Sequence, residues 1–357
     1  MNHVKKYFPL LLLLVFSFSC KKNKKEEESD SDFKKSTILE NVGSNLILAN
    51  YQTMDLKLTD FQQKYDTFIA NQSPENFTLL KSSWKESYIQ WEKILMFEFG
   101  PAMEELMKAS FGTFPSDTTK VLNNISTGSY DLYQVSNITA QGLPVFDFLL
   151  YRNNAISFFG QTNYAQYGKE LILKMKGHLQ TVISKWNSSY LSTFVSSTGT
   201  ESTSAFSIFV NEFVKSYEEL KWTKIGIPLG KQSLGITQPY YIEAKYSKIS
   251  FQLMLENMKA LQRLFNGDKE DGTIGVGFDD YLNALDKNSL TNSINTEFQG
   301  IISIIGTFTT DFETTLNNNP QDLDALYTKI HNLTVLLKTD MTSSFGIMIT
   351  YQDNDGD

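Results

Sequence analysis

Cysteine and histidine are nearly absent from this chain of 357 residues. The one cysteine is Cys20, so the chain has no pair of cysteines from which to form an internal disulfide. The histidines are His3, His178 and His331, and no HExxH motif joins any two of them. The sequence also lacks GxSxG, a phosphate-binding glycine loop and CxxC. These absences exclude the common short signatures of hydrolases, nucleotide-binding proteins and zinc sites.

Two weaker signals for metal binding also fail. His178 and His331 fall at the border of polar and apolar helix faces, which is typical of surface or half-buried side chains rather than ligands. The acidic ending DNDGD does not fit a calcium loop. An EF-hand needs glycine at its sixth position and glutamate at its twelfth, but the chain ends one residue after Gly356.

A surplus of positive charge is missing too. The formal net charge is −8, and it becomes −10 if Lys5 and Lys6 are removed with an N-terminal signal. Nucleic-acid binding depends on clustered Lys and Arg, so we expect no nucleic-acid partner. An acidic surface favours solubility and is compatible with cations.

The chain has one long apolar run, Phe8–Phe18, which is too short to span a bilayer well. It follows Lys5 and Lys6, as in a signal peptide, and leads directly to Cys20. The segment resembles a bacterial lipobox, which implies cleavage before Cys20 and lipidation of its sulfur. An ordinary cleaved signal is the alternative. We therefore expect a signal peptide over residues 1–19.

Residues 20–38 contain many charged and few large apolar side chains, so they are predicted to form a disordered tether. The residue after the cysteine, Lys21, is not the aspartate associated with inner-membrane retention. The charged stretch also resembles the surface-export signals of Bacteroidota lipoproteins. The expected location is the cell envelope, with the protein lipid-anchored to the outer membrane on its periplasmic or surface face.

Beyond the tether, apolar residues recur at helical spacing. After Ser73-Pro74, a cap and a first helical residue, one stripe comprises Phe77, Leu80, Trp84, Tyr88, Trp91 and Leu95. After Asn319-Pro320, a second stripe comprises Leu323, Leu326, Ile330, Leu333, Leu337 and Met341. The two segments align without a gap from the shared proline to a shared Phe-Gly, and this favours an internal duplication.

Further helices are predicted over residues 161–190, 203–221, 240–266 and 288–317, with a Ser/Thr-rich break near 191–204. The sequence thus predicts an all-α fold of two related helical bundles packed together. The N-terminal bundle is expected over residues 39–196 and the C-terminal bundle over 197–357.

Several segments, in order, resemble the imelysin-like family, also filed as M75 peptidases. They are FEFGPA (97–102), FPSD (114–117), VLNNISTGSYDL (121–132), QGLPVFDFLLY (141–151), PYYIEAKYSKIS (239–250) and NMKALQRLFNG (257–267). The last residues, from LLKTDM to the end, resemble Bacteroidota members. The resemblance implies an all-helical fold of two related bundles and an envelope protein linked to iron uptake or regulation.

The family signature GxHxxE, proposed to bind a metal, is degenerate here. Its positions correspond to Gly142, Pro144 and Asp147, so proline replaces the histidine and a shorter carboxylate replaces the glutamate. Pro144 has no ligating side chain, but it favours a helix start that would leave Asp147 in the first turn. Asp147 is then either a hydrogen-bonded structural residue, the interpretation we favour, or a ligand.

A single carboxylate needs converging ligands to hold zinc or iron. The candidates to join Asp147 are Glu98, Glu243, Tyr246 and Ser250. The cofactor is unknown, with iron or another divalent cation as the expectation to test, and iron-uptake components are the expected partners.

Three functions remain open on the sequence. The favoured one is a lipoprotein without catalytic chemistry that binds a cation or small ligand in a cleft between the bundles. An M75-type metallopeptidase is the second, although hydrolysis needs a metal with an open position and the signature histidine is missing. The third is a structural or partner-binding surface lipoprotein that has lost the site.

Overall fold

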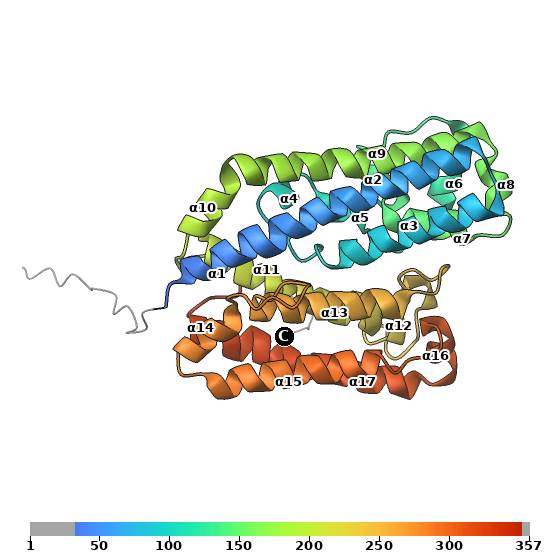
Figure 1. The fold of residues 1–357 in the computed structure, drawn as a ribbon. Helices are drawn as coiled ribbons and strands as arrows, with labels where there is room; N and C mark the ends of the chain where they lie inside the picture. The colour runs from blue at the N-terminus through green and yellow to red at the C-terminus, as the bar shows by residue number, and fades with distance from the viewer. Residues whose placement is uncertain (1–32, 352–357) are drawn as a thin grey trace, which may run out of the picture. The chain divides into compact units, whose positions relative to one another are not determined.

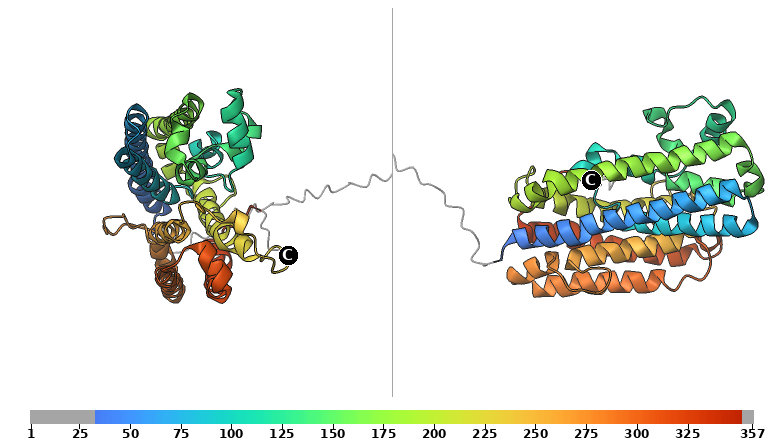
Figure 2. Two further views of the ribbon diagram at one scale, coloured as in Figure 1. Left: turned by 90° about the vertical axis from the view of Figure 1, so that its right-hand side faces the viewer. Right: turned by 45° about the horizontal axis from the view of Figure 1, so that its top comes forward.

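The computed structural model describes residues 33–351, and all regular structure in that range is helical (Figure 1). The prediction of an all-α fold is confirmed. The helices form two layers, seen nearly end-on in the left view of Figure 2, which pack as one compact unit. Cys20, the predicted signal peptide and most of the predicted tether lie outside the described residues. Within residues 33–351, no helix combines the length and apolar character that crossing a bilayer requires.

The first half of the chain forms the layer drawn from blue to green in Figure 1. Its elements are α1 (Lys35–Asn41), η1 (Val42–Leu48), α2 (Ala49–Ala70), α3 (Pro74–Glu92), α4 (Pro101–Glu104), α5 (Met107–Phe111), α6 (Thr118–Thr127), η2 (Val135–Ala140), α7 (Leu143–Tyr151), α8 (Ala155–Phe159), α9 (Thr162–Lys185), η3 (Trp186–Tyr190) and α10 (Leu191–Ser196). The long helix α2 packs against both α3 and α9.

The second half forms the layer drawn from yellow to red. Its elements are α11 (Ala205–Glu219), η4 (Leu220–Gly226), α12 (Ile227–Leu229), η5 (Pro239–Tyr241), α13 (Ser250–Asn266), α14 (Phe278–Ala284), α15 (Asn288–Ile305), α16 (Phe312–Asn318), α17 (Pro320–Val335), η6 (Leu336–Met341) and α18 (Thr342–Phe345). Here α15 packs between α13 and α17. The chain passes between the layers after α10. The predicted bundle boundary at residues 196 and 197 stays a prediction.

Local sequence explains the starts of both repeated helices. The Ser73 hydroxyl accepts a hydrogen bond from the Asn76 N–H at 3.2 Å, and Pro74 begins α3. Pro320 begins α17 in the same way, although the Asn319 side chain makes no capping bond there. The predicted stripes of both helices are buried. The two helices thus share a start and a buried face, and their common origin by duplication stays a prediction.

Helix α7 lies in the core of the first layer because aromatic side chains enclose it. The Trp84 indole N–H donates to the Leu143 carbonyl at 3.0 Å, which fixes the start of α7 against α3. The Phe146 ring packs edge-on against Phe61 and Tyr65 of α2, with centroids 4.9 and 6.3 Å apart. These contacts fix the position of α7 and therefore that of Asp147.

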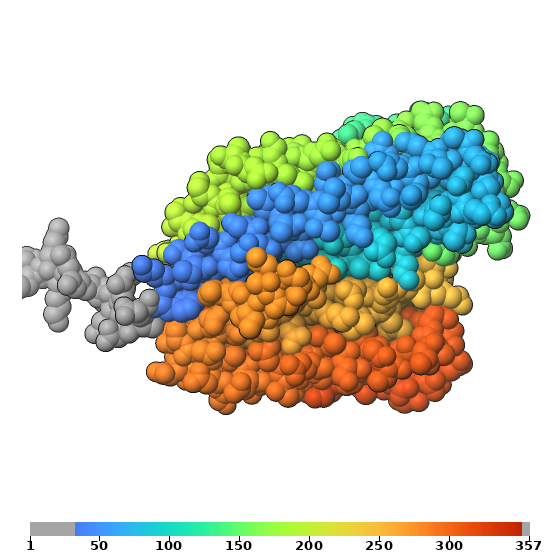
Figure 3. Space-filling view, viewed as in Figure 1, coloured from blue at the N-terminus to red at the C-terminus, as the bar shows by residue number. Residues whose placement is uncertain are grey.

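The two layers meet along α3 and α13, and Figure 3 shows the blue and cyan surface resting on the orange one. Amide side chains join them. The Asn257 amide donates to the Glu92 carbonyl at 2.8 Å, and Asn41 donates to the Gly267 and Val276 carbonyls at 2.8 and 3.0 Å. Side chains that hydrogen-bond to backbone carbonyls hold this seam in register.

Three predicted boundaries differ from the structure. Helix α1 begins at Lys35 and buries Ile38, so the predicted tether ends several residues too late. The helix predicted over 240–266 begins only at Ser250, since Ala244 and Lys248 have positive φ angles of 46° and 63°. The helix predicted over 288–317 breaks at Gly306, and Asp311 caps a new helix, α16, by accepting from the Thr314 N–H at 3.0 Å.

Candidate functional site

The two layers enclose a cavity of about 440 Å³, which we call the interlayer pocket. Its walls come from the end of α3 and the segment after it, from α5 and the loop that follows, from the α11–η4 junction, and from α13 with the loop before it. The lining residues are Trp91, Leu95, Glu98, Lys108, Ala109, Gly112, Thr113, Phe114, Glu219, Leu220, Thr223, Lys224, Glu243 and Asn257. A largely apolar cavity with a few charged groups is the usual form of a small-ligand site.

A buried ionic cluster forms the floor of this pocket. The Lys224 ammonium of η4 lies 2.9 Å from Glu92 Oε1 of α3 and also contacts the Glu243 carboxylate. The Tyr88 hydroxyl donates to Glu243 Oε1 at 3.1 Å. The three charged side chains are all at least nine-tenths buried. Two carboxylates therefore share one ammonium where water cannot screen their repulsion.

The pKa values of the cluster reflect that imbalance. Burial, and next the Glu243 charge, raise the pKa of the Glu92 carboxyl well above its usual range. Burial opposes the charge on Lys224, but Glu243 and Glu92 outweigh it and raise the pKa of the ammonium. Lys224 is thus the resident cation between the two carboxylates. It lies in a π-helical segment, a geometry that is frequent at functional sites.

Glu98 occupies the pocket wall without an ionic partner among the described residues. One of its oxygens, Oε2, accepts from the Lys108 backbone N–H at 3.1 Å, whereas the Lys108 ammonium pairs with Glu219. Burial raises the pKa of the Glu98 carboxyl to about 7, against the opposing effect of the Lys108 N–H. Glu98 is therefore a half-buried carboxylate that faces the pocket and titrates near neutral pH.

Asp147 has a different environment. It is 3% exposed, and its two oxygens accept from the backbone N–H groups of Tyr246 and Ser247 at 3.0 and 2.8 Å. Burial raises the pKa of Asp147 to about 6, and these hydrogen bonds oppose the rise. Since α7 begins at Leu143, Asp147 is the fifth helical residue and not a first-turn residue as predicted. It connects α7 to the loop before α13.

Gly142, at the position that the sequence predicts to correspond to the glycine of the family signature, has a steric role. Gly142 has a φ of +83°, and a Cβ there would lie 2.5 Å from the Phe111 carbonyl oxygen. Both facts exclude a larger residue. Pro144 is the second residue of α7, where its missing N–H leaves no bond unmade. In this chain, two of the three signature positions thus shape the start of a helix.

The structure divides the predicted ligand residues into two groups. Glu98 and Glu243 line the interlayer pocket. Asp147, Tyr246 and Ser250 support the loop that carries Glu243. The Ser250 hydroxyl donates to the Glu243 carbonyl, and the Tyr246 ring packs on Phe148 with centroids 5.4 Å apart. The loop therefore places Glu243 in the pocket wall, whereas the other three residues do not line the pocket.

The residues present do not fit a divalent metal. Pro144 offers no donor, the oxygens of Asp147 already accept two N–H groups, and Lys224 lies between the carboxylates that could otherwise converge. Within residues 33–351, no three His, Cys, Asp or Glu side chains are placed to hold a metal ion. His178 is half-buried beside Glu105, 3.3 Å away, and His331 is exposed, so neither reaches the pocket.

Sequence reasoning missed Glu92, Lys224 and Asn257. Glu92 had a signal, because it lies four residues after Tyr88 and three before Leu95 on an apolar stripe, where a charge needs a partner. Lys224 follows the end of the helix predicted over 203–221 and had no such pattern. Only the packing of η4 against α3 reveals it.

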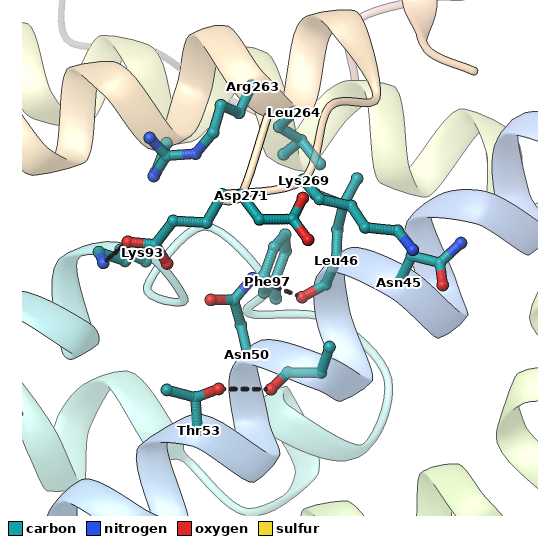
Figure 4. A pocket seen from close by; sticks show the side chains of 13 residues that line it. Asn45, Leu46, Asn50, Thr53, Lys93, Phe97, Arg263, Leu264, Lys269 and Asp271 are labelled. Carbon is teal, nitrogen blue, oxygen red and sulfur yellow. Dashed lines mark hydrogen bonds and ion pairs between the residues drawn. The ribbon is translucent and has the colours of Figure 1, made fainter. Parts of the chain in front are cut away.

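A smaller cavity of about 240 Å³ also takes Lys93 and Phe97 from the segment after α3 (Figure 4). It lies between α2 and α13 and includes Lys93, Arg263, Lys269, Glu270 and Asp271. Lys93 pairs with Glu270 there. None of the predicted ligand residues lines it, so we place the candidate site in the interlayer pocket.

Comparison with known proteins finds a matching family model and solved structures with a similar fold. A family model described as imelysin, peptidase M75, matches residues 47–338. No curated protein matches the chain. A solved structure of a protein described as an iron-regulated protein A precursor, from Parabacteroides distasonis ATCC 8503, superposes with a TM-score of 0.73 at 18% identity. The alignment covers 87% of this chain and 95% of that one.

A second solved structure, an imelysin-like protein from Psychrobacter arcticum 273-4, superposes with a TM-score of 0.74 at 16% identity. It covers 90% of this chain and 99% of that chain. At these identities the two structures establish the shared fold. The family model adds the sequence relationship over most of the chain, and the protein therefore belongs to the imelysin family.

Proposed function

We propose that this protein is an exported, lipid-anchored imelysin-family member that binds a small ligand in the interlayer pocket, as a component associated with iron uptake and without catalytic chemistry. The observation that carries the proposal is the pocket itself. It has about 440 Å³ of space, an apolar wall and charged side chains from both layers. The association with iron is suggested by the description of the Parabacteroides neighbour as iron-regulated.

The donor set favours binding of a ligand over hydrolysis of a peptide. A metallopeptidase needs a metal with an open position and a base beside its water. Here Lys224 lies between Glu92 and Glu243, and both Asp147 oxygens are already hydrogen-bonded.

A pocket-filling variant tests the proposal. Thr223 lines the pocket, and its hydroxyl bonds only to the Glu219 carbonyl at 2.7 Å, so Thr223→Phe adds bulk without breaking a tertiary contact. Its matched control is Thr181→Phe, since Thr181 makes the same bond to the Gly177 carbonyl, at 3.0 Å, on the exposed face of α9. Both variants and the wild type are screened by thermal shift against a small-molecule metabolite library.

Binding to the native state raises its stability, so we expect some compounds to raise the melting temperature of the wild type and of Thr181→Phe but not of Thr223→Phe. Fe²⁺, Fe³⁺, Zn²⁺ and Ca²⁺ are screened in parallel and are expected to give no shift. The proposal is wrong if every compound shifts the melting temperatures of all three proteins equally, or if no compound shifts any of them. Reduced iron accumulation in a deletion strain under iron limitation tests the link to iron uptake.

A further inference from the structure

The charges around the interlayer pocket point to a class of ligand. Building on the proposed function, we propose that the ligand carries a protonated amine on an apolar body, and that the amine pairs with Glu98. The inference rests on the charge balance of the pocket, on acceptors left without donors, and on the character of the remaining wall.

Acidic groups outnumber basic ones in and beneath the pocket. The carboxylates are Glu92, Glu98, Glu219 and Glu243, and the ammonium groups are Lys108 and Lys224. Both ammonium groups are committed, Lys108 to Glu219 and Lys224 to the two buried carboxylates. The next ion pair outward, Lys215 with Glu212, is neutral as a unit. The pocket thus has two more carboxyl groups than ammonium groups, and Glu98 is the pocket carboxyl that no described ammonium pairs with, so the pocket favours a cation beside it.

Hydrogen-bond acceptors are also in surplus. Glu98 accepts one backbone N–H and makes no ion pair within the described residues. Asn257 is fully buried and lines the pocket, and its Oδ1 has no hydrogen-bond partner, although its amide donates to the Glu92 carbonyl. An unpaired acceptor in such a place is costly. A primary ammonium has three N–H donors and no acceptor, so it complements this surplus.

The rest of the wall suits an apolar body. Trp91, Leu95, Phe114 and Leu220 line the cavity between the charged groups. Trp91 is held in place by stacking on Phe111, with ring centroids 5.0 Å apart. A small aromatic or aliphatic amine can bury its body against this wall while its charged end reaches Glu98. A carboxylate ligand of the same size would meet the surplus of negative charge.

Three probes that share a phenyl ring but differ in charge test this inference: 2-phenylethylamine (cationic), 2-phenylethanol (neutral) and phenylacetate (anionic). Their affinities for the full chain are measured by isothermal titration calorimetry at neutral pH. We expect the amine to bind at least about tenfold more tightly than the alcohol, which corresponds to about 1.4 kcal/mol, and phenylacetate to bind most weakly. Glu98→Gln should abolish the preference for the amine.

The matched control is Glu86→Gln, because Glu86 is an exposed carboxylate 3.1 Å from Lys57 on the surface of α3. It should keep the preference. Circular dichroism verifies the fold of each variant, and Glu98→Asp, which keeps the charge, should retain part of the preference even if Glu98→Gln folds poorly.

Several outcomes overturn the inference. They are tighter or equal binding of the alcohol or phenylacetate, no binding of the amine at millimolar concentration, or an amine preference that persists in Glu98→Gln. The proposed function fails separately. If phenylacetate or phenylethanol binds the wild type and not Thr223→Phe, the pocket does bind ligands and only the amine assignment is wrong. If no compound in the wider screen distinguishes those two proteins, the proposed function itself is wrong.

Discussion

At the scale of single residues, Asp147 has a structural role in this chain. Both of its oxygens accept backbone N–H groups from a loop about a hundred residues away in sequence. Such a carboxylate is fully satisfied without a ligand. Asp147 is a charged residue within the largely apolar segment QGLPVFDFLLY, but its partners are backbone atoms, which no side-chain pattern predicts.

Substitution of Asp147 tests this role. Asp147→Asn should be costly, since an asparagine would turn an NH₂ donor toward one of the two N–H groups. We expect both Asp147→Asn and Asp147→Ala to lower the free energy of unfolding by about 1–3 kcal/mol. Urea denaturation measures this, with the exposed Asp60→Asn as control. An Asp147→Asn variant as stable as the wild type would show that these hydrogen bonds contribute little.

Glu98 predicts a pH dependence. Its folded-state pKa of about 7 lies above its usual value of 4.5, so the folded protein holds more protons than the unfolded chain between those values. Stability from this group is therefore greatest at low pH and is lost as pH rises through 7. The charges facing Glu98 are Lys108, Lys215 and Glu212, which leave burial dominant.

We accordingly expect Glu98→Gln to be more stable than the wild type at pH 8, by an amount of order 1–3 kcal/mol, and nearly equal to it at pH 5. Urea denaturation at a series of pH values measures the difference. The control is Glu86→Gln, whose free energy of unfolding relative to the wild type should not change with pH. A difference that is constant with pH would mean that Glu98 titrates normally.

At the scale of elements, periodicity predicted those helices whose stability comes from burying one face. The stripes of α3 and α17 lie in the core as predicted because each side chain needs only its own helix to be placed correctly. The segment 240–249 failed for the opposite reason. It has helical composition, but Asp147 captures two of its N–H groups and Ala244 and Lys248 adopt positive φ. A long-range contact overrode the local preference.

The residues of the candidate pocket also divide into those that local sequence identifies and those that depend on long-range packing. Glu98 and Glu243 were found because they lie in family-like segments, whereas Lys224 was missed because its significance depends on the approach of η4 to α3. The tilt of one helix against another is a property of packed surfaces and is not encoded in either stripe alone.

Substitution of Lys224, in η4, tests how much the buried ionic cluster contributes to stability. Lys224→Met removes the ammonium that neutralises Glu92 and Glu243 and should cost about 3–5 kcal/mol at neutral pH, because two carboxylates remain buried without a cation. The loss should shrink as pH falls and these groups take up protons. The control, Lys231→Met, removes a half-exposed ion pair with Asp324 and should cost no more than about 1 kcal/mol. Equal losses in the two variants would argue against a buried cluster.

At the scale of the whole molecule, polar contacts join the two layers, which form one compact unit. The Asn257 and Asn41 bonds cross the seam, and the interlayer pocket takes residues from both sides of it. A ligand bound there would contact both layers at once. Binding should therefore stabilise the protein as a unit, which gives the thermal-shift experiments one cooperative transition to follow.

We propose an outer-membrane location from the N-terminal sequence, which lies outside the described residues. Cys20 directly follows an apolar run with lysines before it, as in a lipoprotein signal. One acyl chain binds a membrane only marginally, whereas a multiply acylated cysteine anchors stably. We expect the wild type to remain with outer membranes in high salt and Cys20→Ala to appear in the soluble fraction. Circular dichroism should show Cys20→Ala to be as helical as the wild type, since the cysteine precedes the helices that the structure describes. Cys20→Ala protein that still sediments with membranes after a high-salt wash would refute the anchor.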